Sequence, residues 1–303
     1  MSNHVRINKI FENAKRIKFT NNDRLVFFSD VHRGNNSWAD EFAVNEIIYL
    51  HALQHYYHAG FTYVEVGDGD ELLKFKYIEP IRIAHEDVFR LLQKFLDAKR
   101  LNYIYGNHDN DYHNPNLVHR RPKRIFTKII EEPRIRFDAF ETYEGLVFEH
   151  EESGVNFFTV HGHQGDDLFH RFIWISQLFL RFIWAPLQSL GFQDPTSIAQ
   201  NFYKRRKVEE VLMNWCADNH QPLICGHTHK ERFPKEDRAP YFNTGSCVYP
   251  HRISCIEIVG GKISLIRWRI KPDKKGKLVV KRSVQKGPRK IEDLCQSTTF
   301  NEM

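Results

Sequence analysis

Long hydrophobic runs are missing from this sequence of 303 residues. No stretch approaches the roughly 18 consecutive apolar residues that a bilayer-spanning helix needs. The first residues, 1–19, alternate polar, basic and apolar side chains and lack the continuous apolar core of a secretory signal peptide. We therefore expect a cytoplasmic protein.

Cysteine is also scarce. The five cysteines are odd in number and show no short paired spacing. This pattern argues against a disulfide scaffold and against a zinc site built from thiolates. We expect reduced thiols with no role in the chemistry.

The charge is only mildly basic, with a formal net charge of +6. Such a charge favours an anionic substrate or surface without proving one. Much of the basic excess lies in residues 271–290, which we expect to belong to a solvated tail that is poorly ordered from about Lys274 onward. A nuclease would need a long basic groove, so this distribution makes a nucleic acid partner unlikely.

The first half of the chain alternates strand-like and helix-like segments. Short apolar runs at residues 24–29, 61–66 and 101–105 predict buried strands, and the periodicity of 38–58 and 79–99 predicts helices between them. Alternation at this spacing indicates parallel strands joined by right-handed crossovers. Ligands of such sheets bind at the carboxyl ends of the strands.

The second half is richer in strands. Further strands are predicted at 134–137, 146–150, 156–160 and 222–225, and a helix at 196–217. The segments 241–242, 253–258 and 262–268 are expected to close the fold as antiparallel strands. The fold class is therefore α/β.

Five short polar motifs stand directly after predicted strands. The first three are Asp30-Val31-His32, then Gly67-Asp68 with Glu71 close behind, then Gly106-Asn107-His108-Asp109. Residues two apart on an extended chain point to one side, so Asp30 and His32 can hold one ion together. His108 is suited to donate a proton, with Asp109 to orient its ring. Glu71 is expected to support Asp68.

The last two motifs are His161-Gly162-His163 and Gly226-His227-Thr228-His229, each after an apolar strand. Each motif alone also fits an ordinary polar turn at a strand end. A pair of histidines directly after a buried strand is more typical of a metal site.

The order of the five motifs resembles the calcineurin-like metallophosphoesterase superfamily, from about Leu25 to Ser246. The segment FNTGS at 242–246 resembles the family pattern as well. The resemblance implies a four-layer α/β/β/α sandwich of two mixed sheets, in agreement with the pattern of strands and helices. We expect three regions along the chain. A metallophosphoesterase domain at 24–270 is preceded by an N-terminal extension at 1–23 and followed by a basic C-terminal tail at 271–303.

The resemblance assigns a role to each motif residue. One metal ion would be held by Asp30, His32 and His229, and the other by Asn107, His161 and His227, with Asp68 bridging both. His108 would be the general acid and Asp109 its partner.

Two divalent ions about 3.5–4 Å apart share a water molecule and lower its pKa, so that hydroxide attacks phosphorus in line. The predicted function is hydrolysis of a phosphoester or phosphoanhydride bond. We expect manganese, although mixed nitrogen and oxygen ligands also suit Fe, Zn, Co or Ni. The alternatives are a nuclease or cyclic-nucleotide phosphodiesterase of the same superfamily, and a non-catalytic scaffold of the same fold. Such a scaffold would usually lose ligands.

Residues 166–188 form a segment that is apolar nearly all round. It lies within a predicted helical insertion at about 166–217. The insertion resembles that of the UDP-2,3-diacylglucosamine hydrolases, although those enzymes carry Arg where this chain has His108. Three interpretations remain open: a core or dimer-interface helix, a lid rimmed by Arg171 and Arg181 that holds an apolar substituent of a phosphorylated small molecule, or a membrane-surface helix.

Three further residues are candidates for substrate contacts. Arg33 and Asn35 follow the first motif, and His113 follows the third. For each of them an exposed loop position is an equally good interpretation.

Overall fold

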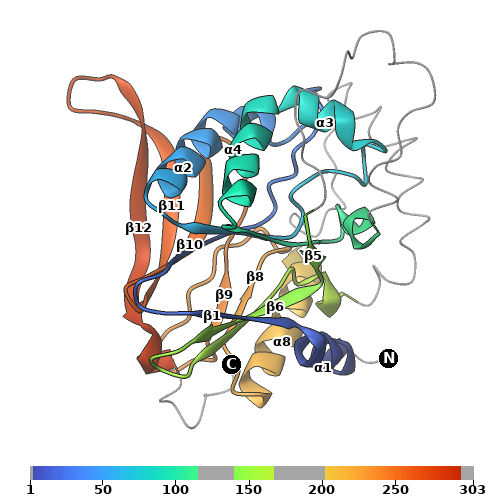
Figure 1. Cartoon of the computed structure of the whole chain (residues 1–303), viewed down its shortest axis with the longest axis vertical. Coiled ribbons are helices and arrows are strands. Elements are labelled where there is room, and N and C mark those ends of the chain that lie inside the picture. The colour runs from blue at the N-terminus through green and yellow to red at the C-terminus, as the bar shows by residue number, and fades with distance from the viewer. Residues whose placement is uncertain (1–2, 115–139, 167–201, 295–303) are drawn as a thin grey trace.

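The computed structural model describes residues 3–114, 140–166 and 202–294 (Figure 1). The strand expected at 134–137 lies outside these ranges, as do all but the ends of the insertion expected at 166–217. None of the described helices has the length and apolar character needed to span a bilayer.

A mixed seven-stranded sheet carries the first three motifs. Its order is β12-β11-β10-β2-β3-β4-β5. The strands are β2 (Arg24–Phe28), β3 (Thr62–Val66), β4 (Leu101–Ile104), β5 (Thr142–Tyr143), β10 (Arg252–Val259), β11 (Lys262–Pro272) and β12 (Leu278–Lys290). Strands β2, β3 and β4 are parallel, as the alternation predicts, and β5, which was not predicted, pairs in parallel with β4. Strands β10, β11 and β12 are antiparallel.

A mixed five-stranded sheet carries the two histidine motifs. Its order is β1-β6-β7-β8-β9, with β1 (Lys15–Phe19), β6 (Gly145–His150), β7 (Asn156–Val160), β8 (Leu223–Cys225) and β9 (Tyr241–Asn243). The prediction of an antiparallel strand at 241–242 is wrong, because β9 pairs in parallel with β8. The connection between them is long enough to return the chain to the starting edge, as a parallel pair requires.

Helices cover the outer face of each sheet (Figure 1). Helices α2 (Glu46–His58), α3 (Ile78–Ala84) and α4 (Glu86–Asp97) lie on the seven-stranded sheet, and α1 (Asn3–Asn13) and α8 (Phe202–Asp218) lie on the other. Three apolar clusters separate the layers, and the middle one joins Phe27 and Val64 of one sheet to Phe148 and Ile224 of the other. The predicted α/β/β/α sandwich is confirmed.

The helix predicted at 38–58 begins later. A short 3-10 turn, Ala43–Asn45, precedes α2. The Asp40 carboxylate accepts hydrogen bonds from the backbone N–H of Phe42 at 3.1 Å and of Ala43 at 3.2 Å. These contacts hold residues 38–42 in a turn, because a side chain that captures backbone donors competes with the helix.

The helix predicted at 79–99 is two helices, separated at His85. His85 is fully buried, with Nε2 2.8 Å from Asp40 Oδ2 and Nδ1 3.1 Å from Glu46 Oε1. Burial lowers the pKa of His85, but the contacts with Asp40 and Glu46 outweigh it and raise the pKa to about 9. A buried imidazolium therefore ties the break between α3 and α4 to the start of α2.

Both ends of the chain belong to the sandwich. Residues 1–23, expected as an extension, supply helix α1 and strand β1, which pairs in parallel with β6. The expectation of poor order from Lys274 onward is wrong for 274–294. Strand β12 pairs with β11 along its length, and a 3-10 turn, Ile291–Leu294, buries both of its terminal side chains. Lysines spaced between the apolar residues of β12 hide this strand in the sequence.

Candidate metal centre

The five motifs meet where the carboxyl ends of β2, β3, β4, β7 and β8 come together. Nine non-glycine residues among those described have a positive φ, and five of them are predicted ligands: Asp30, His32, Asp68, His227 and His229, with φ between 51° and 68°. Backbone of this kind costs of order 1–3 kcal/mol per residue and persists only where the surrounding structure enforces it. Its concentration in the predicted ligands marks a functional site.

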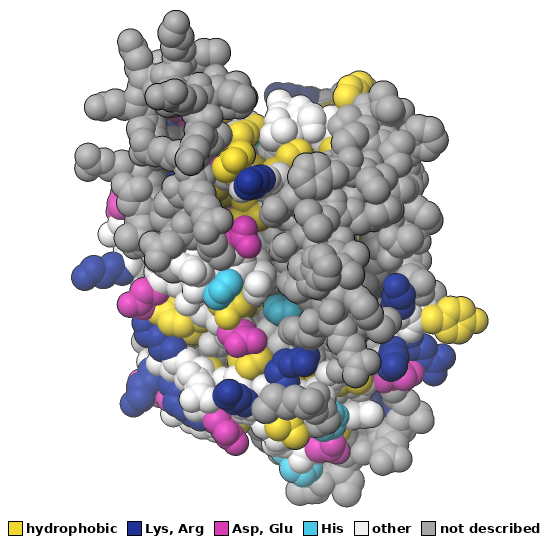
Figure 2. All heavy atoms as spheres, turned by 90° about the vertical axis from the view of Figure 1, so that its right-hand side faces the viewer, with side chains coloured by type: hydrophobic (Ala, Val, Ile, Leu, Met, Phe, Trp, Pro, Cys, Tyr) yellow, Lys and Arg dark blue, Asp and Glu magenta, His cyan; other side chains and the backbone are white. Residues whose placement is uncertain are grey.

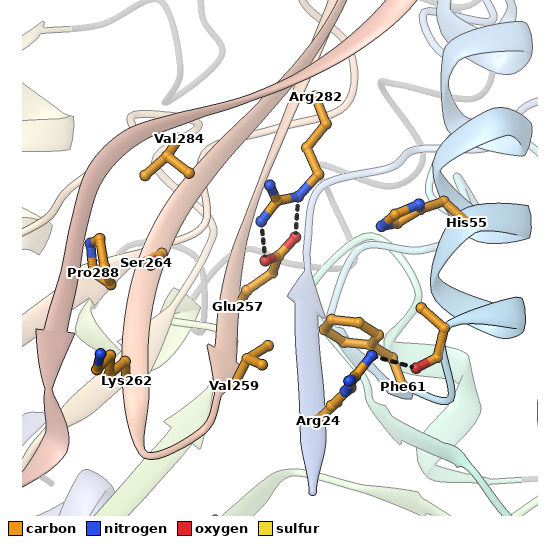
Figure 3. Close-up of a pocket in the computed structure, with 11 residues that line it drawn as sticks. Arg24, His55, Phe61, Glu257, Val259, Lys262, Ser264, Arg282, Val284 and Pro288 are labelled. Atoms are coloured by element: carbon orange, nitrogen blue, oxygen red, sulfur yellow. Dashed lines mark hydrogen bonds and ion pairs between the residues drawn. The ribbon is translucent and has the colours of Figure 1, made fainter.

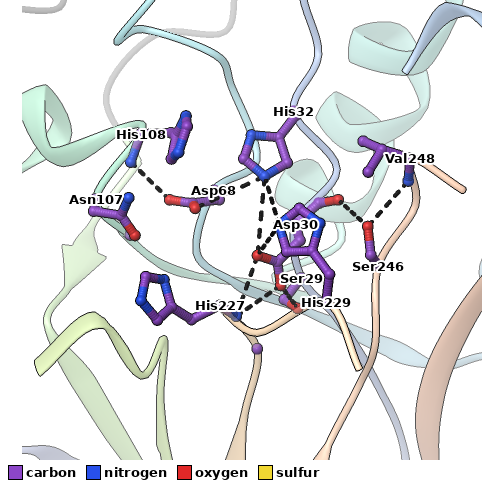
Figure 4. A network of polar contacts seen from close by, with 12 residues as sticks. Ser29, Asp30, His32, Asp68, Asn107, His108, His227, His229, Ser246 and Val248 are labelled. Atoms are coloured by element: carbon purple, nitrogen blue, oxygen red, sulfur yellow. Dashed lines mark hydrogen bonds and ion pairs between the residues drawn. The ribbon is translucent and has the colours of Figure 1, made fainter. Parts of the chain in front are cut away.

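The first ligand group contains Asp30, His32 and His229 (Figure 4). His229 Nε2 lies 3.1 Å from Asp30 Oδ1 and 3.2 Å from His32 Nε2. His32 Nδ1 lies 3.1 Å from Glu71 Oε2. Because a carboxylate only accepts, Nδ1 of His32 carries a hydrogen, and Nε2 faces the other members of the group.

The second group contains Asp68, His161 and His227, with Asn107 beside them. His161 Nδ1 donates a hydrogen bond to the Val66 carbonyl at 2.8 Å. Its Nε2 therefore carries a lone pair whenever the ring is neutral. That Nε2 lies 3.0 Å from Asp68 Oδ2 and 3.1 Å from Asn107 Oδ1. Once the ring is neutral, three atoms that all prefer to accept converge, and a cation between them would satisfy all three.

Asp68 lies between the two groups. Its Oδ2 is 3.0 Å from His161 Nε2 of the second group and 3.8 Å from His32 Nε2 of the first. Its Oδ1 accepts a hydrogen bond from the His108 backbone N–H at 2.8 Å. One carboxylate oxygen is thus placed to serve both groups, as a bridging ligand does.

The spacing of the donor atoms is compatible with metal ligation. Ligand atoms about 2.1 Å from one ion lie roughly 3.0–3.4 Å from one another at the usual bond angles. The short contacts within the two groups, 3.0–3.2 Å, match this spacing. In addition, Nε2 of the buried His227 has no hydrogen-bond partner. A buried lone pair aimed into an all-acceptor site is the atom that a cation would satisfy.

The protonation states follow the same charges. Burial raises the pKa of Asp30, but His229 and His161 outweigh it and lower the pKa to about 2. Burial lowers the pKa of His161, but Asp68 raises it to about 9. Burial and the neighbouring His161 lower the pKa of His227 to about 3, so His227 stays neutral and free to ligate.

His108 is held by a residue for which the sequence predicted another role. Its Nδ1 lies 2.8 Å from Glu71 Oε1 and 3.0 Å from Oε2. Glu71 therefore contacts both His108 and the ligand His32. The prediction that Asp109 orients the His108 ring is wrong, because the contact belongs to Glu71, from the turn after β3.

Asp109 instead fixes the backbone of two ligand turns. Its fully buried carboxylate accepts from the N–H groups of Gly106 at 2.6 Å, Gly69 at 2.8 Å and Asp68 at 3.2 Å, and from the Tyr103 hydroxyl at 2.8 Å. Burial and the nearby Asp68 raise the pKa of Asp109 to about 6. The turns after β3 and β4 are thereby tied together beneath the ligands.

Arg33 cannot be a substrate contact. Its side chain is fully buried, with Nε 2.7 Å from Asp70 Oδ1 and Nη1 3.1 Å from Glu65 Oε2. Asn35 is partly buried and accepts from the Ser37 N–H at 3.2 Å, and His113 is exposed on a short 3-10 turn, Asn110–His113. Substrate contacts by Asn35 and His113 stay predictions.

Residues that the sequence did not assign support Asp30. Its Oδ2 accepts a hydrogen bond from the Ser29 hydroxyl, which also lies 2.5 Å from the Thr244 hydroxyl. The Ser246 hydroxyl donates to the Asp30 carbonyl at 3.3 Å. Thr244 and Ser246 belong to the FNTGS segment, so that motif was the available signal.

The site is open on one side. The His108 side chain is 25% exposed, whereas Glu71 behind it is 3% exposed. On one face of the molecule, histidine and acidic side chains reach the surface close together (Figure 2). The His108 side chain is therefore accessible to solvent, whereas Glu71 is not.

A separate hollow of about 380 Å³ lies between β10–β12 and the end of α2 (Figure 3). Glu257 and Arg282 form a double contact in it, with Nε to Oε1 at 2.9 Å. None of the residues that line this hollow belongs to the predicted site.

Comparisons with known proteins give distant similarities. No protein-family model and no curated protein matches the chain. The crystal structure of Vps29 from Chaetomium thermophilum has a TM-score of 0.38 at 10% identity, over 86% of this chain and 96% of that chain. The crystal structure of a mutant cold-active protein tyrosine phosphatase has a TM-score of 0.40 at 13% identity, over 90% of this chain and 83% of that chain. The site geometry alone must therefore support a function.

Proposed function

We propose that this chain is a dinuclear metal-dependent phosphoesterase of the calcineurin-like superfamily. The observation that carries the proposal is the position of Asp68 Oδ2 between two groups of nitrogen and oxygen donors, 3.0 Å from His161 and 3.8 Å from His32. A shared carboxylate between two cation sites is typical of two-metal hydrolases.

The chemistry of the donors suits this role. The two groups offer imidazole, carboxylate and amide ligands and no thiolate. Such ligands favour Mn, Fe, Zn, Co or Ni, and we propose manganese. When bound, two such ions neutralise phosphate oxygens and lower the pKa of a water molecule.

His108 would supply the proton. Glu71 holds its Nδ1, so Nε2 points away from Glu71 and is available to a bound substrate. Burial lowers the pKa of His108, but Glu71 and Asp68 raise it to about 9. The ring is therefore protonated at neutral pH and can donate to the leaving oxygen of a phosphoester or phosphoanhydride.

The substrate would be a phosphorylated small molecule. An apolar substituent is the prediction attached to the aromatic segment at 166–188, of which only 166 lies within the described residues. A screen of phosphomonoesters, cyclic and linear diesters and nucleoside diphosphate conjugates would identify the bond.

Metal dependence is the direct test. Protein stripped of metal should not hydrolyse bis-p-nitrophenyl phosphate or p-nitrophenyl phosphate, and Mn²⁺ should restore turnover. The Asp68→Asn variant should bind less metal at both groups, measured by metal analysis after dialysis. Full turnover by the metal-free protein would contradict the proposal.

His108 has a control in an exposed histidine outside the predicted site. His108→Ala should keep its metal content and lose a factor of about 10²–10⁴ in kcat, the usual contribution of a general acid. His58→Ala removes an exposed imidazole from the last turn of α2 and should leave kcat unchanged. Equal activity of both variants would remove His108 from the mechanism.

A further inference from the structure

The antiparallel pair β11 and β12 forms a basic hairpin at one side of the molecule. Residues 271–290 contain nine lysines and arginines and one aspartate, a net charge of +8. The whole chain carries +6, so the remaining residues together carry −2. The positive charge of this protein is therefore a property of one ordered hairpin.

The arginines and lysines of this hairpin differ in their surroundings. Arg267 pairs with Glu231 and Arg282 with Glu257, both against the body of the protein. Within the described part of the chain, Lys271, Lys274, Lys275, Lys277 and Lys281 have no carboxylate within ion-pair distance. The charge of these lysines is left uncompensated.

The pairing of the two strands also places positively charged side chains opposite each other. Arg269 lies directly opposite Lys281, and Lys262 lies directly opposite Lys290. Like charges at opposed positions destabilise a sheet. Lysine on an edge strand also prevents edge-to-edge association, which explains charge on β12. It does not explain Lys274, Lys275 and Lys277, which lie in the turn beyond the ladder.

An exposed apolar residue stands among the turn lysines. Leu278, which directly follows Lys277, is 69% exposed. The one acid of the turn, Asp273, uses its Oδ1 to accept from the N–H groups of Lys275 at 2.8 Å and Lys277 at 2.9 Å. Asp273 therefore shapes the turn. The turn between β11 and β12 projects from the molecule as a tip (Figure 1). Its exposed lysines place cations around the side chain of Leu278.

We propose that this tip, residues 271–278, docks the protein on bilayers that contain anionic lipids. Lysines near such a surface are attracted by its negative potential, and an apolar side chain between them can enter the interface. A nucleic acid is the less suitable partner. The hairpin from 269 to 290 has no aromatic side chain on which a base could stack. In addition, a phosphate backbone offers no apolar environment for the exposed Leu278.

The tip also has a defined relation to the candidate metal centre. Strand β10 is antiparallel to both β2 and β11, so β2 and β11 run in the same direction. The turn after β2, which holds Asp30 and His32, and the basic tip after β11 therefore lie at the same end of the strands of this sheet. Membrane docking does not depend on the proposed catalytic activity and can be tested without it.

Cosedimentation of the full chain with vesicles tests the proposal. The protein should bind vesicles of phosphatidylcholine mixed with phosphatidylserine and not vesicles of phosphatidylcholine alone. High salt should weaken the binding, because it screens exposed charges. Each lysine near the surface contributes about fivefold in affinity, so replacing Lys274, Lys275 and Lys277 together by Ala should weaken binding roughly 100-fold. Equal binding to both vesicle types would refute the proposal.

A control variant separates the tip from the net charge. It replaces by Ala three exposed lysines from other parts of the surface: Lys9, Lys94 and Lys235. This control should bind like the unchanged protein, and a loss equal to that of the tip variant would overturn the assignment.

Leu278→Gln separates lipid from other polyanions. It should remove the binding that persists at high salt, since only a bilayer offers an apolar phase. Tighter binding to duplex DNA than to the anionic vesicles would overturn the proposal in favour of nucleic acid.

Discussion

Replacing Arg33 by Met should destabilise the protein strongly. The guanidinium is fully buried between Glu65 and Asp70, at 3.1 Å and 2.7 Å. Removing one partner of a buried ion pair costs about 3–5 kcal/mol, because the remaining charge is left without compensation. A folded domain is stable by only about 5–15 kcal/mol, so this loss should be large enough to measure by urea unfolding.

The loss should depend on pH. Burial raises the pKa of Glu65, Arg33 and Tyr63 lower it, and the balance is a pKa of about 7. Without Arg33 the pKa of Glu65 rises further. A carboxyl whose pKa is raised on folding destabilises the folded state once the pH exceeds its unfolded pKa, near 4.3. The destabilisation grows by up to about 1.4 kcal/mol for each pH unit between the unfolded and the folded pKa. In the unchanged protein this effect stops growing at the Glu65 pKa of about 7, so the difference in stability between the two proteins should be constant up to about pH 7 and increase above it.

Two further variants serve as a rescue and a control for Arg33→Met. Arg33→Met combined with Glu65→Gln should recover part of the loss and flatten the pH dependence. Arg16→Met breaks a solvent-exposed contact with Glu149 and should cost no more than about 1 kcal/mol. An unchanged urea midpoint for Arg33→Met, together with a raised KM, would refute the buried-anchor interpretation and restore the substrate contact.

Three further changes have defined outcomes. The pKa of His85 is raised to about 9 in the folded protein, so its contact with Asp40 stabilises the fold fully below pH 6.5, and this stabilisation is lost as the pH rises through 9. His85→Gln should therefore remove a component of about 3 kcal/mol from the pH dependence of urea unfolding. An unaltered pH dependence would show that His85 does not contribute to it. A Cβ on Gly226 would lie 2.4 Å from Asp30 Oδ2, so Gly226→Ala should lower metal content, and normal metal analysis would contradict the tight packing. Asp109→Asn should lower the unfolding midpoint and leave the alkaline limb of the pH–rate profile, which is set by deprotonation of His108, in place, whereas a shift of that limb would support the partner role first predicted for Asp109.

The candidate ligands could be named from the sequence because the five motifs, whose order resembles the superfamily, are encoded locally. Each ligand follows a short apolar strand, and the carboxyl ends of parallel strands meet at one edge of a sheet. The pattern of strand ends therefore brings Asp30, Asp68 and Asn107 together without knowledge of any contact. His161 and His227 follow the same rule on the second sheet, where β7 and β8 are parallel.

The partners of these residues could not be predicted in the same way. The carboxylate that contacts His108 depends on how the turns after β3 and β4 face each other across the sheet edge. Asp109 is adjacent in sequence, yet its side chain turns under the ligand turns, while Glu71 reaches His108 from 37 positions away. Sequence adjacency favoured the wrong residue, because neighbouring side chains in a turn do not share a direction.

The C-terminal hairpin shows the same limit. Its composition predicts a solvated tail, and its lysines are indeed exposed. Its order comes from long-range pairing: β12 is held by the ladder with β11, and β11 by β10 and the core beneath it. Local composition cannot show that a partner strand exists.

The sequence alone determined which atoms are offered to a metal and in what order along the chain, since strand ends and residue types are local properties. The tertiary structure decided that Asp68 lies between two donor groups, that Glu71 holds His108, that Arg33 is buried and that the basic residues form a projecting tip. Each of these depends on distances between segments far apart in the chain, and only packing of the layers sets those distances.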